Sequence, residues 1–311
     1  MKTKKSFIGI VFRGLAMGAA DVVPGVSGGT IAFITGIYEE LIDTISGVNL
    51  ALLKTLKNKG FKTFWNQLNG NFILALFLGI GISIASLAKL ITYLLDHHPI
   101  LVWSFFFGLV LASIHLVGKQ VKKWSIATAI AFVIGATLAY YITILPPIQQ
   151  TEANWYIFLS GMIAICAMIL PGISGSFILL LLGAYQTILN AVKSFDVNKI
   201  VVFMLGCVVG LLSFSHLLKW MFKKYESITI AVLTGFLLGS LNKLWPWKKT
   251  LEIYINSHGK EIPLQQKNIS PSTFQQITQQ PHELFYAVLF CVLGIILIVA
   301  LEKMGNKKGT P

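Results

Sequence analysis

The amino-acid sequence predicts an all-α polytopic membrane protein that is built as an inverted-topology repeat. Hydrophobic residues make up 55% of its 311 residues and charged residues only 12%, about half the charged share of a soluble domain. Apolar runs of nearly membrane-spanning length alternate with short polar loops. The seven residues PGVSGGT at Pro24–Thr30 return as PGISGSF at Pro171–Phe177. These two segments are called the first and the second tip.

Six apolar segments are long enough, at close to the ~20 residues that a helix needs, to cross the hydrocarbon layer. They cover residues 71–95, 99–117, 125–144, 199–221, 227–244 and 283–301.

The two tips lie in segments of another kind, residues 7–46 and 155–192. After the first tip only Ile31–Tyr38 is apolar before acidic residues follow, and a helix of this length covers about half a bilayer. We therefore expect a re-entrant helical hairpin around each tip, although the longer arms of the second are also compatible with full spans. Broken backbone at membrane depth must be surrounded by protein or line a wet cavity.

The chain repeats itself. A shift of 147 places the first tip on the second, and beyond the tips a shift of 127 aligns Gly79 with Gly206 and Gly108 with Gly235. Each half then holds one hairpin and three spans, residues 1–147 and 148–311. Since such a half makes an odd number of crossings, the second must be inverted relative to the first, as in many secondary transporters.

Charge predicts the orientation. If both termini are cytoplasmic, most of the 25 basic residues lie in cytoplasmic loops, as the positive-inside rule requires. They form short clusters between apolar runs instead of one patch, which argues against nucleic-acid binding. A polar insert at 247–281 is then extracytoplasmic. Thr250–Asn256 alternates like a strand before a turn at Ser257–Lys260, so the insert is either a small β-hairpin or a disordered loop.

Both tips have the composition of an anion site. A helix start leaves N–H groups unpaired and carries partial positive charge, and glycine lets a ligand approach the backbone. The candidate ligands for a phosphate are Gly25, Ser27, Gly28, Gly29 and Thr30 in the first tip and Gly172, Ser174, Gly175 and Ser176 in the second. The alternative is that these small residues only allow close helix packing.

Three charged residues near the first tip are further candidates. Arg13, the only arginine, suits bidentate phosphate contact, or it reaches the membrane surface as a snorkelling side chain. Asp21 could pair with Arg13 or take up a proton to couple transport. Glu39 is either a gating or coupling group or a solvated helix end. The second half has Ser160 and Met168 in place of Arg13 and Asp21, so these roles are one-sided.

Lys89, His115, His216 and Asn242 lie within spans, where polar side chains usually face the bundle interior. We expect them on the transport pathway, without an assigned role. The sequence has no cluster with metal-ligand spacing and no nucleophile or nucleotide motif, so neither catalytic residues, a metal site nor a cofactor is predicted.

Three stretches, Gly14–Ile42, Leu170–Tyr185 and Gly239–Lys248, resemble the bacterial polyprenyl-phosphate transporter family, formerly domain of unknown function 368. The resemblance covers nearly the whole chain. It implies a plasma-membrane protein that moves undecaprenyl phosphate between leaflets for reuse in cell-envelope polymer synthesis. It also places the glycine-serine tips of the family on the two tips here, and its acidic position on Asp21.

The expected function is therefore transport of polyprenyl phosphate without catalysis, with the head group bound between the tips at the midplane. Protons are a candidate coupling ion, and the oligomeric state stays open. A secondary transporter of a small soluble anion would use the same tips and is the main alternative. A lipid phosphatase is less favoured, because one arginine and no catalytic set leave little to hold and hydrolyse a phosphate.

Overall fold

The computed structural model describes residues 6–23, 26–148, 151–255 and 261–306. Its helices are α1 (Phe7–Val22), α2 (Gly28–Ile34), α3 (Tyr38–Ser46), α4 (Leu50–Gln67), α5 (Gly70–His97), α6 (Pro99–Gly118), α7 (Ile126–Ile144), α8 (Asn154–Ile169), α9 (Gly175–Leu181), α10 (Tyr185–Lys193), α11 (Val197–Leu244), α12 (Pro271–Thr278) and α13 (Leu284–Asn306). The two strands, β1 (Lys248–Ile255) and β2 (Glu261–Asn268), form one antiparallel sheet. The prediction of a mostly helical chain is confirmed.

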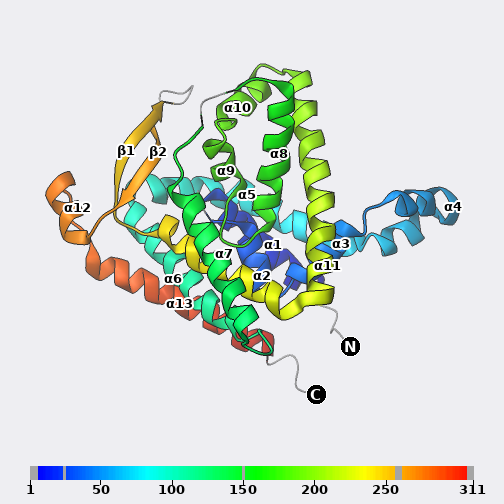
Figure 1. Cartoon of the computed structure of the whole chain (residues 1–311), viewed down its shortest axis with the longest axis horizontal. Coiled ribbons are helices and arrows are strands. Elements are labelled where there is room, and N and C mark those ends of the chain that lie inside the picture. The colour runs from blue at the N-terminus through cyan, green and yellow to red at the C-terminus, as the bar shows by residue number, and fades with distance from the viewer. Residues whose placement is uncertain (1–5, 24–25, 149–150, 256–260, 307–311) are drawn as a thin grey trace.

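Among the described residues, four helices are long and apolar enough to cross a membrane: α5, α6, α7 and α11. The helix α11 holds 48 residues and contains both the 199–221 and the 227–244 segments, with a kink at Tyr225. The apolar part of α13 covers Leu284–Ala300 and is shorter. In Figure 1 α11 descends beside α8 and turns sharply at its lower end. The predicted apolar segments therefore all form helices.

The two tip segments have the same helical build. The lengths of α1, α2 and α3 are 16, 7 and 9 residues, and those of α8, α9 and α10 are again 16, 7 and 9. Besides the break at the tip, each segment has a second bend at a glycine with positive φ, Gly36 at 68° and Gly183 at 64°. There the N–H of the glycine and the next N–H return to carbonyls of the preceding helix, as in a Schellman motif. The bend between α9 and α10 is 106°.

Glycine contacts repeat in both halves as well. A Cβ on Gly14 would approach the Leu76 carbonyl oxygen to 2.3 Å, so α1 and α5 touch backbone to backbone. At the equivalent place a Cβ on Gly161 of α8 would approach the Phe203 oxygen of α11 to 2.6 Å. Small residues allow this close approach of membrane helices, and the sequence repeat therefore preserves a packing contact.

The third span of each half packs on the other half. A Cβ on Gly235 of α11 would meet the Phe132 oxygen of α7 at 2.1 Å, and one on Gly108 of α6 would meet the Cys291 oxygen of α13 at 2.0 Å. The two halves are thereby interlocked, since α7 lies on α11 and α13 lies on α6. The opposite orientation of the halves in a membrane, and their division near residue 147, stay predictions.

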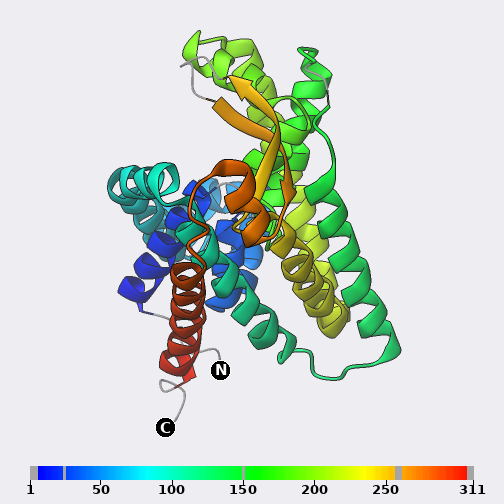
Figure 2. The same cartoon turned by 90° about the vertical axis from the view of Figure 1, so that its left-hand side faces the viewer.

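Two regions extend from this helical body. The predicted strand in the 247–281 insert is confirmed as β1, which pairs with β2; the predicted turn at 257–260 lies outside the described residues. Figures 1 and 2 show this β-hairpin beside α12 at one edge of the molecule. The helix α4, which was not predicted, projects away from the body on the opposite side (Figure 1).

Candidate functional site

The two tips touch each other in the interior of the protein. The Ser27 hydroxyl donates to the Met168 carbonyl oxygen at 2.8 Å, and the Gly172 N–H donates to Thr30 Oγ1 at 2.8 Å. Both Ser27 and Thr30 are fully buried. A Cβ on Gly29 would approach the Ile169 oxygen to 2.5 Å. The tips are therefore in direct contact. Gly25 lies outside the described residues.

The start of α2, in the first tip, is already occupied by a carboxylate of the protein itself, that of Asp21. The carboxylate oxygen Asp21 Oδ1 accepts from the Gly28 N–H at 2.6 Å, and Ser27 Oγ accepts from the Gly29 N–H at 3.0 Å. A Cβ at position 28 would lie 2.5 Å from Asp21 Oδ2, so a larger residue there would displace this carboxylate. Asp21 thus caps α2 from the end of α1, where helix-start N–H groups favour negative charge.

The second tip lacks such a carboxylate. Its Ser174 and Ser176 hydroxyls lie 2.8 Å apart, and no side chain caps the start of α9. Met168 stands where the first half has Asp21, and a Cβ on Gly175 would lie 3.3 Å from the Met168 Cβ. Ser174 is buried, whereas Ser176 is exposed. The same motif therefore forms a capped helix start in one half and an uncapped one in the other.

Arg13 does not pair with Asp21, so that interpretation is wrong for this structure. Its Nη1 donates to the Gly9 oxygen at 2.9 Å, and its Nε donates to the Thr35 oxygen at 3.3 Å. Thr35 is the C-terminal cap of α2, where a cation is favoured by the helix dipole. Arg13 thereby links α1 to the far end of α2, away from the tip.

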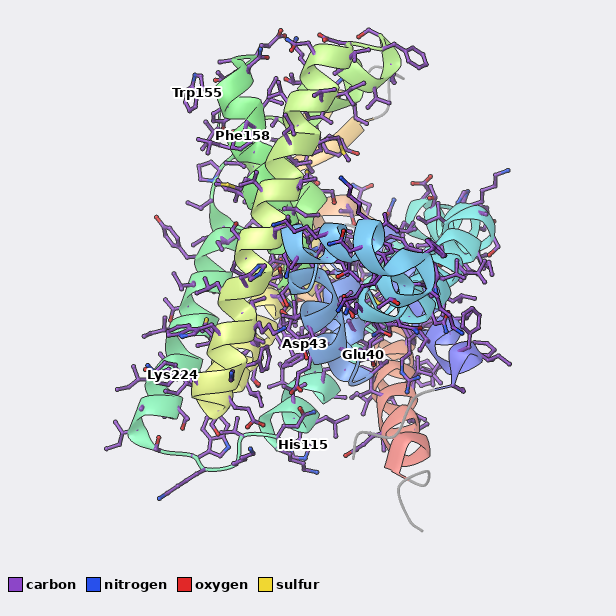
Figure 3. The ribbon with its side chains drawn as sticks, turned by 90° about the vertical axis from the view of Figure 1, so that its right-hand side faces the viewer. Glu40, Asp43, His115, Trp155, Phe158 and Lys224 are labelled. Atoms are coloured by element: carbon purple, nitrogen blue, oxygen red, sulfur yellow. The ribbon has the colours of Figure 1, made fainter. Side chains whose placement is uncertain are left out.

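Glu39 lies in a pocket between α3 and α11 of about 340 Å³, the α3–α11 pocket. Its lining also contains Asp43, Lys219, Lys223 and Glu226. Asp43 Oδ1 lies 3.3 Å from Lys219 Nζ, and Figure 3 shows Asp43 on α3 where this helix faces α11. Three acidic and two basic side chains therefore line this pocket.

Three of the four polar span residues do not face the interior. Lys89, His115 and His216 are exposed on the outside of the packed helices, and Figure 3 places His115 at the lower edge of the molecule. The His216 Nδ1 contacts the Leu212 oxygen of its own helix at 2.7 Å. The expectation that they lie on the pathway was wrong, because their positions on their helices turn these side chains away from the neighbouring helices. Asn242 does line a cavity.

That cavity, which sequence reasoning missed, measures about 400 Å³ and is called the lysine pocket. Its lining comprises Tyr140, Thr143, Ile144, Leu145, Phe177, Asn242, Lys243, Lys248, Leu251, Gln266, Lys267 and Asn268. The available signal was the run of lysines among tryptophans at Lys243–Lys249, at the end of a span. In the part of the chain that the structure describes, no group of three potential metal ligands occurs.

Comparison with known proteins identifies the family. The model of the family described as VCA0040-like, undecaprenyl phosphate translocase-like, matches residues 17–262. A polyprenyl-phosphate transporter of Vibrio cholerae is 48% identical over 302 residues, covering 97% of this chain and 98% of that protein. A polyprenyl-phosphate transporter of Staphylococcus aureus is 31% identical over 256 residues, covering 76% and 85%. No solved structure matches. The chain therefore belongs to the VCA0040-like, undecaprenyl phosphate translocase-like family.

Proposed function

We propose that this protein moves undecaprenyl phosphate, or a related polyprenyl phosphate, between the leaflets of the bacterial plasma membrane, so that the carrier lipid is reused in envelope polymer synthesis. Family membership and the names of the two relatives support the lipid class. The observation that carries the proposal is the contact between the two tips. It brings broken backbone from both halves together inside an apolar helical body.

The donors at this contact suit a phosphate monoester. The Ser27 hydroxyl, the Gly28 N–H and the Gly172 N–H each donate to an acceptor of the protein itself. A phosphate head group offers several strong acceptor oxygens and could replace these internal acceptors one for one. Its charge would otherwise cross the hydrocarbon at high cost. The apolar chain of the lipid stays in the bilayer and needs no site.

Asp21 opposes the binding of the head group and could therefore regulate it. Its carboxylate occupies the helix start that a phosphate would use, and two anions cannot share that place. Head-group entry therefore requires Asp21 to move away or to take up a proton, which is how transport would couple to a proton gradient. Ser174 and Ser176 of the second tip would supply donors without a competing carboxylate.

The test distinguishes lipid transport from its alternatives in one preparation. Proteoliposomes carry a short-chain polyprenyl phosphate in one leaflet, and a membrane-impermeant phosphate probe follows its arrival in the other. Parallel vesicles contain inorganic phosphate, and free phosphate is assayed throughout. We expect protein-dependent lipid transfer without phosphate flux or release. Flux of soluble phosphate without lipid transfer would favour an anion transporter, and released phosphate would favour a phosphatase.

A further inference from the structure

The lysine pocket has the composition of an anion site. Three lysines line it, Lys243, Lys248 and Lys267, and no aspartate or glutamate occurs among the described residues of its lining. In the described part of the chain no ion pair joins Lys243 or Lys248 to a carboxylate. Lys243 and Lys248 are partly buried, and lysines are seldom buried without a partner, so the pocket suits an external anion.

Aromatic rings hold the two inner lysines in place. Lys248 Nζ lies 3.8 Å from the centre of the Trp103 ring and donates to the Lys243 carbonyl oxygen at 2.6 Å. Lys243 Nζ lies 4.4 Å from the centre of the Phe177 ring. Burial, together with the neighbouring charge of Lys243, lowers the pKa of Lys248 well below its usual range. These contacts hold both amino groups in the pocket, where a bound dianion would favour their charged forms.

The amide groups of the pocket are held in a network as well. Asn268 Nδ2 donates to both the backbone oxygen and Oδ1 of Asn242, at 2.8 Å each, and Asn242 Nδ2 donates to Thr143 Oγ1 at 2.6 Å. The network joins β2, α11 and α7. The polar wall of the pocket is therefore built from three separate elements that fix one another.

The remaining wall is apolar and partly exposed. Tyr140, Ile144 and Leu251 line the pocket with about half of each side chain accessible, at 48%, 47% and 49%. A site for a free anion has no use for such a wall, whereas a lipid phosphate needs it for the first carbons of its chain. Tyrosine at the end of a span is typical of the membrane interface.

The pocket also adjoins the second tip. Phe177, the last residue of that tip, lies in the first turn of α9 and forms part of the lining. The α3–α11 pocket, by contrast, contains acidic residues that neutralise its lysines. Of the two pockets, only the lysine pocket combines unbalanced positive charge with contact to a tip.

We propose that the lysine pocket binds the phosphate monoester head group of the transported lipid on the face that carries the β-hairpin, and holds it there before the tips open. This inference rests on the proposed function for the identity of the lipid. It adds a second binding place, outside the tips, which are closed in this structure.

The test is calorimetric titration of the full-length protein in nanodiscs with farnesyl phosphate, farnesol and inorganic phosphate. Lys243→Gln and Lys248→Gln should each weaken farnesyl phosphate binding about tenfold or more, since each removes a charge-assisted contact. Lys267→Glu provides a variant at an exposed position, where folding is not at stake. Its matched control is Lys249→Glu, because Lys249 is exposed, pairs with Lys267 across the β-hairpin and does not line the pocket.

Weakened binding in Lys267→Glu with unchanged binding in Lys249→Glu supports the pocket. Equal loss in both would overturn it in favour of general attraction to the β-hairpin, and wild-type affinity in all variants would overturn it outright. Equal affinity for inorganic phosphate would assign the pocket to a free anion, and equal affinity for farnesol would exclude head-group recognition. Since binding is measured without transport, a failure of lipid transfer by the wild-type protein would remove the proposed function and leave this result standing.

Discussion

The two tips share a motif but differ in what each holds. In the first tip, Asp21 and Ser27 satisfy the opening N–H groups of α2. In the second, α9 has no capping side chain, and Met168 stands in the place of Asp21. The comparison teaches that a duplicated helix break need not yield duplicated chemistry. A single substitution between the halves, Asp21 against Met168, separates a helix start filled by a carboxylate from one without a cap.

Replacing Gly29 should reduce stability more than any other change at the tips. Gly29→Val would drive a branched side chain into the Met168 and Ile169 carbonyl oxygens, which a Cβ alone already approaches to 2.8 and 2.5 Å. We expect a loss of about 3 kcal/mol in stability, at the upper end of overpacking effects, measured by thermal unfolding in detergent. Gly81→Ala is the control, because a Cβ there has open space. A melting temperature equal to that of the control would contradict the close contact of the tips.

Removing the Asp21 carboxylate has the next largest effect. Asp21→Ala leaves the Gly28 N–H without its acceptor, which should destabilise the protein by about 2 kcal/mol. Asp21→Asn keeps an acceptor and should restore part of this loss. Met168→Ala, at the equivalent but partly exposed position, should cost less than Asp21→Ala. If both alanine variants unfold alike, the carboxylate does not cap α2.

Replacing the serines should likewise destabilise the protein more in the first tip than in the second. Ser27 donates to the Met168 oxygen and accepts from the Gly29 N–H, whereas the Ser174 hydroxyl contacts Ser176. Loss of a capping hydroxyl costs about 1 kcal/mol, so Ser27→Ala should lower the melting temperature more than Ser174→Ala. The reverse order would show that the second tip is the more tightly held.

The smallest effect is expected away from both tips. Asp43 and Lys219 form an ion pair whose side chains are about half exposed, at 56% and 47%. Exposed pairs contribute at most about 1 kcal/mol, so Asp43→Asn should change the melting temperature little, and less still at high salt. A loss as large as that of Asp21→Ala would mean that the contact of α3 with α11, and not the tips, holds the halves together.

The sequence alone predicted which segments form helices better than it predicted which residues contact one another. Apolar length placed the spans, and Pro-Gly with Ser-Gly placed both helix breaks, because these signals are local. The second bends at Gly36 and Gly183 were equally local and were overlooked. The sequence gives no signal of a span at α4, because this helix mixes lysines with apolar residues and contains no long apolar run.

The sequence indicated which residues make up the two tips, but not what each of their side chains contacts. Ser27, Thr30 and Gly172 form hydrogen bonds between the two tip segments, whereas Ser174 and Ser176 contact each other. The binding role of these residues stays a prediction. What Asp21 and Arg13 contact depends on how α1 faces α2, which no spacing in the sequence specifies. The lysine pocket draws on α7, α9, α11 and the β-hairpin, so its parts are brought together only by tertiary packing.

The most direct test of the account is lipid transfer by a protein whose tips are altered but folded. Ser27→Ala and Thr30→Val together remove the hydroxyls that join the tips. The proteoliposome assay then compares this double variant with the wild-type protein and with Ser86→Ala, an exposed serine whose hydroxyl bonds only within its own helix. The account predicts transfer by the wild-type protein and by Ser86→Ala, and its loss in a double variant that remains folded. Transfer at the wild-type rate by the folded double variant would contradict it.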